Sequence, residues 1–312
     1  MSEGHPRLGV LLMTYGSPAP DLSDIAEYLA AVRGGRPAPD DLVAEFRRRY
    51  EVIGGSPLIP ITRQQAAAVA DRLRSDGVAA HATIGMRFSR PTITHGLREL
   101  ADLGCDRVTA IVMSPQYSEL LMAGYRRALD AAAEELGPEA PAVDLAPAWH
   151  RQPGFVQAVA ERIAEGLADL PAGTPVLLTA HSLPRRVAEA EPAYLDQLRE
   201  TAEAVASAAG IEPGRWRFCW QSAGHEPGEW MTPDFADLMP ELRADGHGAV
   251  LVAPIQFLAD HLEILYDVDI GAREQAESAG MRFARIASLN VSPTFIGALA
   301  RIATEPMRAG VA

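Results

Sequence analysis

The segments LLMTYGSP at 11–18 and LLTAHSLP at 177–184 decide the fold class of this chain. Each is an apolar run that ends in a turn of small residues and proline, which is typical of a buried parallel strand with a polar side chain at its carboxyl edge. When the two segments are superposed, Tyr15 aligns with His181. Open α/β sheets bind ligands at this edge, so both side chains are candidate site residues.

Shorter matches elsewhere repeat with nearly one spacing. IVMSPQYS at 111–118 aligns with LVAPIQFL at 251–258, which places their prolines 139 positions apart, and PGF at 153–155 aligns with PTF at 293–295, 140 positions apart. The repeats indicate a duplication. We expect two similar halves whose strand ends face each other across one cleft.

Runs of strand length alternate with helical segments along the whole chain. Strands are predicted at 8–13, 79–85, 107–113, 143–147, 175–180, 216–220, 249–255 and 282–288. Segments such as 64–77 and 154–170 carry Ala, Arg, Glu and Leu with helical period. The alternation predicts an α/β fold of two similar Rossmann-like domains, each a parallel sheet flanked by helices. We place the domains at 1–155 and 156–312, with the last helix, 293–304, able to pack on the first domain.

Composition limits the classes of partner. The chain has 312 residues, of which 48% are apolar, and 28 basic against 41 acidic residues leave a net charge of −13. This balance argues against nucleic acid as a partner and leaves small molecules and cations open. The N-terminal MSEGHPR is polar, and no apolar run approaches the ~20 residues of a membrane span. We therefore expect a cytoplasmic protein without stable membrane insertion.

His181 is a candidate base or metal ligand. A lone histidine is more often a structural residue, but the end of a strand in an α/β sheet is a ligand-binding position. Imidazole titrates near neutrality, so it can take a proton from a weak acid or bind a borderline metal.

The segment FLADHLEILYDVDI at 257–270 carries Asp260, His261, Glu263 and Asp267 in or around one helix. Glu263 and Asp267 are four residues apart and so share a helix face, which suits a divalent cation. The alternative is a solvated acidic face. The apolar neighbours leave little purely solvated surface, and buried carboxylates are costly unless they bind something.

The segment 27–58 is dense in arginine for so acidic a chain. Its arginines are Arg33, Arg36, Arg47, Arg48 and Arg49. They can pair with nearby Asp and Glu residues on a charged helix surface, or they can bind carboxylates of a ligand. The Gly-Gly-Ser-Pro turn at 54–57 would let the backbone approach that ligand closely.

Motifs along nearly the whole length resemble those of the ferrochelatases, and within them the soluble bacterial type that inserts ferrous iron into coproporphyrin III. The motifs are LLMTYGSP, RRRYEVIGGSPL, GMRFSRP (85–91), SPQYS, AHSLP, WQSAGHEPGEWMTPD (220–234) and DHLEILYD. The resemblance implies a porphyrin cleft between two Rossmann-like domains, as in other chelatases. It also implies a lyase of haem biosynthesis that yields coprohaem.

The resemblance also implies roles for single residues. His181 and Glu263 match the family's pair at the metal-insertion site. Tyr15 matches the tyrosine on the opposite face of the macrocycle and is a candidate axial ligand. The residues that match propionate contacts are Arg33, Arg49, Ser56 and Tyr125.

Three departures from the family pattern concern the metal sites and the segment 27–58, which would contact the edge of the porphyrin and is called the rim below. Gly271 stands where the acidic line often continues, with Glu274 nearby, and the glycine turn before Ser56 is one residue shorter. Only Cys105 and Cys219 are present, whereas the cluster-binding relatives use four cysteines, so we expect no iron–sulfur cluster and no cofactor beyond the substrate Fe²⁺. The expected partners are porphyrin and ferrous iron, and a downstream haem-pathway enzyme is compatible with this.

Other functions stay open. The alternatives are a protoporphyrin IX ferrochelatase, a chelatase for another tetrapyrrole or metal, and a two-lobed solute-binding or haem-carrier protein. The polar, arginine-rich segment at 27–58 favours a four-propionate porphyrin over a two-propionate one. Carriers of the last kind are usually exported, and the sequence has no export signal.

Overall fold

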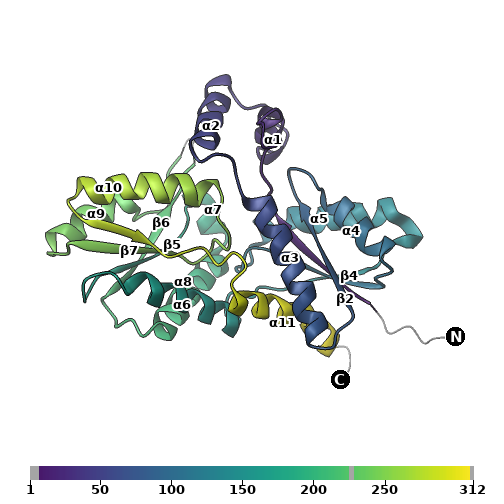
Figure 1. Cartoon of the computed structure of the whole chain (residues 1–312). Helices are drawn as coiled ribbons and strands as arrows, with labels where there is room; N and C mark the ends of the chain where they lie inside the picture. The colour runs from purple at the N-terminus through teal and green to yellow at the C-terminus, as the bar shows by residue number, and fades with distance from the viewer. Residues whose placement is uncertain (1–6, 225–227, 310–312) are drawn as a thin grey trace. The chain divides into compact units, whose positions relative to one another are not determined.

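A computed structural model describes residues 7–224 and 228–309 (Figure 1). His225, Glu226 and Pro227, within the motif at 220–234, lie outside the described residues. The chain forms two compact units. Of the described residues, unit 1 contains 7–114, 119–149 and 290–309, and unit 2 contains 115–118, 150–224 and 228–289.

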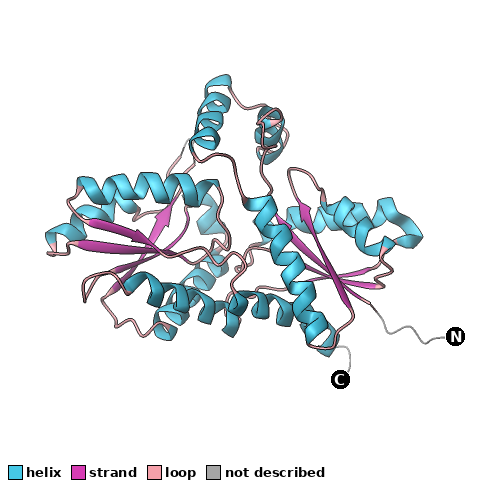
Figure 2. Cartoon of the chain, viewed as in Figure 1, coloured by secondary structure: helices cyan, strands magenta, loops and turns pink. Residues whose placement is uncertain are grey.

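Unit 1 is a parallel sheet with flanking helices. Its strands are β1 (Leu8–Thr14), β2 (Ala80–Met86), β3 (Arg107–Val112) and β4 (Ala142–Leu145), in the order β2-β1-β3-β4. Its helices are α1 (Ile25–Val32), α2 (Asp40–Val52), α3 (Leu58–Ser75), α4 (Ile93–Asp102), α5 (Glu119–Leu136), the 3₁₀-helix η1 (Gly137–Glu139) and α11 (Pro293–Ala309). Figure 2 shows helices beside the strands of this sheet, whereas α1 and α2 stand apart from it (Figure 1).

Unit 2 repeats this plan. Its strands are β5 (Val176–His181), β6 (Trp216–Gln221), β7 (Ala249–Pro254) and β8 (Arg282–Arg285), all parallel and in the order β6-β5-β7-β8. Its helices are α6 (Pro153–Leu167), α7 (Arg185–Ala190), α8 (Pro192–Ala208), α9 (Phe235–Ala244), the π-helix η2 (Glu263–Ala272) and α10 (Arg273–Ser278). The first strand of each unit thus takes the same inner place in its sheet. The two predicted parallel sheets with flanking helices are confirmed.

The boundary between the units differs from the one drawn from the sequence. A division after residue 155 would cut α6, which begins after Gln152, whose side chain accepts a hydrogen bond from Phe155 N (2.9 Å). The structure keeps this helix whole in unit 2 and begins the unit at His150. Helix α11 belongs to unit 1.

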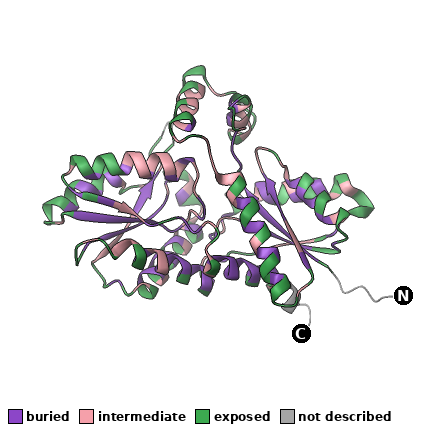
Figure 3. Ribbon diagram, viewed as in Figure 1, coloured by how far each residue is buried: buried purple, intermediate pink, exposed green. Residues whose placement is uncertain are grey.

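The sheet of unit 1 is buried because both of its faces are covered. All seven residues of β1 are buried, which matches its uninterrupted apolar sequence (Figure 3). Helix α11 packs against α3 and β3, and Thr109 of β3 donates its hydroxyl to the carbonyl of Ala303 (2.9 Å). The strand ends that carry the site are therefore held by a well-packed layer.

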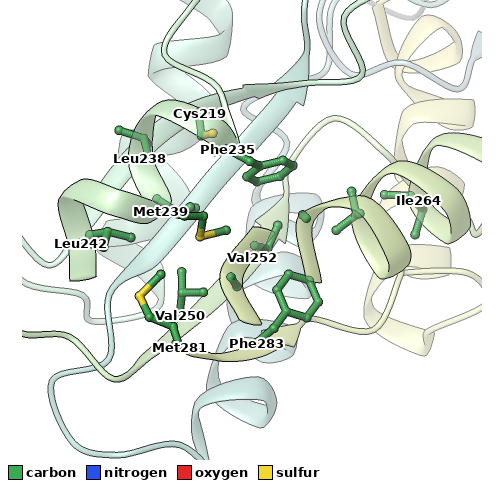
Figure 4. Close-up of a cluster of buried hydrophobic side chains, with 14 residues drawn as sticks. Cys219, Phe235, Leu238, Met239, Leu242, Val250, Val252, Ile264, Met281 and Phe283 are labelled. Atoms are coloured by element: carbon green, nitrogen blue, oxygen red, sulfur yellow. The ribbon is translucent and has the colours of Figure 1, made fainter. Parts of the chain in front are cut away.

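In unit 2 a hydrophobic cluster joins β7 to α9 and η2 (Figure 4). Leu238 of α9, Val252 of β7 and Ile264 of η2 are each at most 1% exposed. Asp234 begins α9 by accepting hydrogen bonds from Ala236 N and Asp237 N. This packing fixes η2, the helix that carries Glu263.

The acidic segment is not the regular α-helix predicted from its spacing. Residues 263–272 form a π-helix, and the residues from Phe257 to His261 precede it without helical structure. A π-helix bonds i to i+5, so a residue four positions on falls short of a full turn. Among the described residues, no helix combines the length and apolarity needed to cross a membrane.

Candidate functional site

His181 closes β5 with its ring oriented by the backbone. The backbone N–H of His181 donates to Gln256 Oε1 (2.8 Å), and the ring nitrogen Nδ1 lies 2.6 Å from the carbonyl of Ser182. A carbonyl only accepts, so in the neutral ring Nδ1 carries the proton and Nε2 keeps its lone pair. Nε2 is therefore able to take a proton or bind a metal.

A chain of ring contacts leads from His181 to Glu263. The ring of Phe257 lies edge-on to His181 with centroids 6.3 Å apart, and it lies 4.7 Å from the ring of His261. His261 Nε2 is 3.3 Å from Glu263 Oε2. The structure thus brings the predicted pair, His181 and Glu263, into one neighbourhood of unit 2.

His261 is a member of this neighbourhood to which the sequence analysis gave no role. Its Nδ1 lies 2.8 Å from the carbonyl of Ala259, so this nitrogen also carries the proton. The opposite nitrogen then faces the carboxylate of Glu263. Two lone-pair groups attract each other only when a proton or a metal cation lies between them, so this pair is suited to share one.

Asp260, one of the carboxylates in the acidic segment 257–270, is held by hydrogen bonds within unit 2. Asp260 accepts hydrogen bonds from Ser288 Oγ (2.7 Å) and from Arg285 (3.4 Å), which makes it part of the fold of unit 2. Within residues 7–224 and 228–309, no group of three or more His, Cys, Asp or Glu side chains is placed to hold a metal ion. A cavity of about 850 Å³ in unit 2 is lined by Gly271 and Glu274 among others, and it includes neither His181 nor Glu263.

In unit 1, Tyr15 follows β1 and is 41% exposed. Its ring lies 5.2 Å from that of Phe88 and 6.3 Å from that of Tyr125, centroid to centroid. The guanidinium carbon of Arg87 is 4.6 Å from the centroid of Phe88, 5.4 Å from that of Tyr125 and 5.8 Å from that of Tyr15. The structure thus places two predicted substrate residues, Tyr15 and Tyr125, around the guanidinium of Arg87. Their ring faces attract this cation and stabilise the cluster.

Tyr125 is buried, and this burial raises the pKa of its phenol well above 10, with the neighbouring Tyr15 raising it further and Arg87 opposing the shift. Its hydroxyl therefore stays protonated and can donate a hydrogen bond. Gly124 makes the arrangement possible, because a Cβ there would overlap the guanidinium of Arg87. The sequence analysis missed Arg87. Its signal was a basic residue directly after a buried strand, within the motif GMRFSRP.

Two further rim residues lie at turns. Arg33 ends α1, and its Nε is buried without a hydrogen-bond partner among the described residues. Ser56 follows Gly54 and Gly55, which have positive φ of 74° and 91°, and its Oγ lies 3.4 Å from Leu58 N. Glycine adopts such backbone angles readily, so this turn depends on both of them.

Arg49 lies in α2 and is paired within its own helix. Its Nε donates to Glu45 Oε1 (2.8 Å), while Arg48 donates to both oxygens of the same carboxylate (2.9 and 3.0 Å). The two arginines lower the pKa of Glu45 from 4.5 to about 2. The predicted surface pairing is therefore present, and the side chain of Arg49 is less exposed than that of Arg48, at 20% against 54%.

Both cysteines are buried and free. Burial raises the pKa of the thiols of Cys105 and Cys219, so both stay protonated. Protonated, buried thiols are poor nucleophiles and poor metal ligands.

Comparison with known proteins connects these features. The profile of the ferrochelatase family matches residues 7–307. The chain belongs to the ferrochelatase family. It is therefore a lyase of haem biosynthesis that inserts metal into a porphyrin.

Relatives of this ferrochelatase cover nearly the full length. A ferrochelatase of Deinococcus radiodurans is 39% identical over 95% of this chain and 94% of its own. Coproporphyrin III ferrochelatases of Geobacillus kaustophilus and Bacillus subtilis are 35% and 32% identical, over 94% and 96% of this chain and 94% and 98% of theirs.

Solved structures of SirB and of a protein described as similar to chelatases share the fold of the enzyme. SirB from Bacillus subtilis with Fe³⁺ superposes with a TM-score of 0.59 at 11% identity, covering 98% of each chain. DR2241 from Deinococcus radiodurans, described as structurally similar to chelatases, has a TM-score of 0.53 at 14% identity over 96% of this chain and 55% of its own. At these identities the likeness concerns the fold alone.

The candidate residues of the ferrochelatase fall into two groups. His181 and Glu263 lie in unit 2, and the five others, Tyr15, Arg33, Arg49, Ser56 and Tyr125, lie in unit 1. That the two groups face one porphyrin stays a prediction.

Proposed function

We propose that this enzyme inserts ferrous iron into coproporphyrin III and so forms coprohaem. Two of the relatives described above, at 35% and 32% identity, carry the name coproporphyrin III ferrochelatase. The observation that carries the proposal is the arginine-bearing rim formed by α1 and α2. A rim of guanidinium groups suits a porphyrin with four propionates better than one with two.

Arg33 is the strongest single support for a carboxylate ligand at this rim. A buried N–H donor without an acceptor costs free energy of about 1–3 kcal/mol, so such donors normally have a partner. The Nε of Arg33 is such a donor among the described residues. A propionate oxygen offers the charge-assisted acceptor that this position lacks.

Arg49 would bind a propionate by partner exchange. Its fork is partly occupied by Glu45, which it shares with Arg48 (2.9 Å). A propionate that approaches Arg49 therefore competes with one carboxylate already shared between two cations. Arg48 can retain Glu45 through both of its oxygens when Arg49 turns to the substrate.

The chemical step needs a base and a path for the ion. The four porphyrin nitrogens point inward, two of them carry protons, and the ion must lose water before it enters. Binding at the rim favours insertion only if the bent ring is held more tightly than the flat one. His181 takes one pyrrole proton at Nε2, and the His261–Glu263 pair, which is suited to share a proton, takes the second. Glu263 also offsets the charge of the arriving iron and orients the imidazole of His261. Tyr15 is the candidate axial ligand on the other face.

The test compares two porphyrins and two neighbouring arginines. Purified enzyme is incubated anaerobically with Fe²⁺ and either coproporphyrin III or protoporphyrin IX in the same detergent, and the absorbance spectrum is followed. We expect higher kcat/KM for coproporphyrin III. Arg49→Ala should lower kcat/KM for coproporphyrin about tenfold or more, since a hydrogen bond to a charged group is worth about 1.5–3 kcal/mol, and should lower it less for protoporphyrin.

Arg48→Ala is the matched comparison. It leaves Glu45 paired with Arg49 alone, so kcat/KM for coproporphyrin should fall, but by less than in Arg49→Ala, because the guanidinium that binds the propionate is still present. Equal efficiency of the wild type on the two porphyrins would show that the rim is only a charged surface and would overturn the coproporphyrin assignment.

A further inference from the structure

Arg285, at the end of β8, uses all five of its N–H groups. Nε and Nη2 donate to the two oxygens of Asp269 (2.7 and 2.9 Å), and Nη1 donates to the carbonyl of Ile286 (2.8 Å) and to Ser288 Oγ (3.2 Å). The remaining N–H, on Nη2, reaches Asp260 Oδ1 (3.4 Å). Arginine has five donors in a rigid plane, so the guanidinium is held in one orientation.

The two carboxylates held by Arg285 flank the neighbourhood of Glu263. Asp260 directly precedes His261, and Asp269 lies in η2 beyond Glu263. Ser288 Oγ also donates to Asp260 Oδ1 (2.7 Å), so this carboxylate is held from two sides. The stretch that carries His261 and Glu263 is thus fixed at both ends to the end of β8.

The shape of η2 makes such a hold necessary. A π-helix is uncommon and usually limited to a single turn, whereas this one covers ten residues. Contacts outside the helix must therefore stabilise it. Arg285 supplies a bidentate ion pair to the middle of η2, and its side chain is only 13% exposed. Removal of that cation would take the opposing charge away from two largely buried carboxylates, which is more costly than the loss of a surface pair.

We propose that Arg285 is a positioning residue for metal insertion. It sets where His261 and Glu263 lie relative to His181 by binding Asp260 and Asp269 at once. The proposal rests on the role given to Glu263 in the proposed function. The residue acts through the carboxylates it holds and does not contact porphyrin or iron itself.

Arg285→Met and Arg285→Lys test this role. Methionine keeps the length of the side chain and removes the charge, while lysine keeps the charge but not the planar fork. We expect Arg285→Met to lower kcat for iron insertion at least tenfold, with the dissociation constant for porphyrin in the absence of iron within twofold of the wild type. Arg285→Lys should recover part of the lost kcat.

Arg273→Met is the matched control. Arg273 also donates to Asp269, but to its backbone carbonyl (2.9 Å), and its guanidinium lies 4.9 Å from the ring centroid of Phe283. In the part of the chain that the structure describes, its side chain makes no hydrogen bond to the carboxylate of Asp260 or Asp269. Its loss should leave kcat within twofold, although it removes a contact of the same helix.

Thermal unfolding of each variant separates positioning from stability. A kcat for Arg285→Met within threefold of the wild type in folded protein would overturn the proposal. So would a parallel loss of kcat and porphyrin affinity, since that is the signature of a general structural role.

If Arg285→Met does not fold, Ser288→Ala is used instead. It removes one hydrogen bond to Asp260, and it should lower kcat severalfold with porphyrin binding intact. An unchanged kcat would again overturn the proposal.

Glu263→Gln distinguishes the two levels of failure. If Glu263→Gln retains full turnover, the role of Glu263 in the proposed function fails, and the positioning role fails with it. If Glu263→Gln is inactive while Arg285→Met is not, only the positioning role fails.

Discussion

His181 presents a lone pair on Nε2 because Ser182 binds its other nitrogen (2.6 Å). We expect His181→Ala to abolish iron insertion while porphyrin still binds, since the proposed rim contacts lie in other elements. The rate should fall more than tenfold, which corresponds to about 1.4 kcal/mol of barrier. Anaerobic turnover measures the first effect, and porphyrin absorbance without iron measures the second. Turnover within tenfold of the wild type would remove His181 from the mechanism.

The two cysteines allow a test of the expectation that no iron–sulfur cluster is bound. Cys105→Ala and Cys219→Ala together should leave iron insertion and the visible spectrum of the purified protein unchanged. The substitutions shorten two buried side chains, so the unfolding temperature should fall modestly. A visible charge-transfer band in the anaerobically purified wild type, lost in the double variant, would contradict the expectation.

At the scale of residues, the sequence predicted side chains at strand ends better than side chains held by distant partners. Tyr15 and His181 follow apolar runs, and that pattern is local. Arg285 was not predicted, because its partners Asp260 and Asp269 lie 25 and 16 residues away and a basic residue at a strand end is usually solvated. Arg87 was missed for the same reason. Its role depends on rings that other elements carry.

Helix α5 accommodates Arg87 through a glycine, which normally weakens a helix. Alanine at this position is favoured by about 1 kcal/mol in an exposed helix, so Gly124→Ala should not lower the stability of the helix itself. Its Cβ would instead displace the guanidinium of Arg87 from the rings of Tyr15 and Tyr125. We expect lower turnover without loss of fold, measured by iron insertion and by thermal unfolding.

A double substitution shows whether Gly124 acts through Arg87. Arg87→Ala alone should lower turnover by a similar factor, and Gly124→Ala added to it should have little further effect, because the group that it displaces is gone. Additive losses would mean that Gly124 has a separate function in α5.

The pairing within α2 predicts a response to acid. The pKa of Glu45 is lowered from 4.5 to about 2, so its ion pairs stabilise the folded state above pH 4.5, and this contribution is lost as the pH falls through 2. Wild type should therefore lose more stability than Glu45→Gln between pH 4.5 and 2, as measured by denaturant unfolding at several pH values. The same pH dependence in both proteins would show that the pair does not contribute.

Helix η2 marks a limit of prediction from sequence at the scale of elements. Apolar and acidic residues in 257–270 indicated a helix, and a helix is present from Glu263. Its π form depends on contacts with β8 and α9, which no local pattern contains. The strands, by contrast, were predicted within a few residues, since each is an apolar run bounded by turns.

At the scale of the whole molecule, the two units predict separate responses to a core substitution. Phe295 of α11 is fully buried and lies 6.3 Å from the ring of Trp149, both in unit 1. Phe295→Ala should cost about 3–5 kcal/mol. Hydrogen exchange should accelerate in β1 and β3 more than in β5 and β7. Equal acceleration in both sheets would mean that the chain unfolds as one cooperative body.

Helix α11 also has a consequence for how the polypeptide is made. A ribosome releases residues 150–289 before residues 290–309, so unit 2 can complete its contacts while unit 1 still lacks the helix that packs on α3 and β3. Until Phe295, Leu299 and Ile302 emerge, the apolar surface that they cover is open to water and to other nascent chains. The sheet of unit 1 is therefore translated first but is covered last, and during that interval its apolar surface depends on a chaperone for protection.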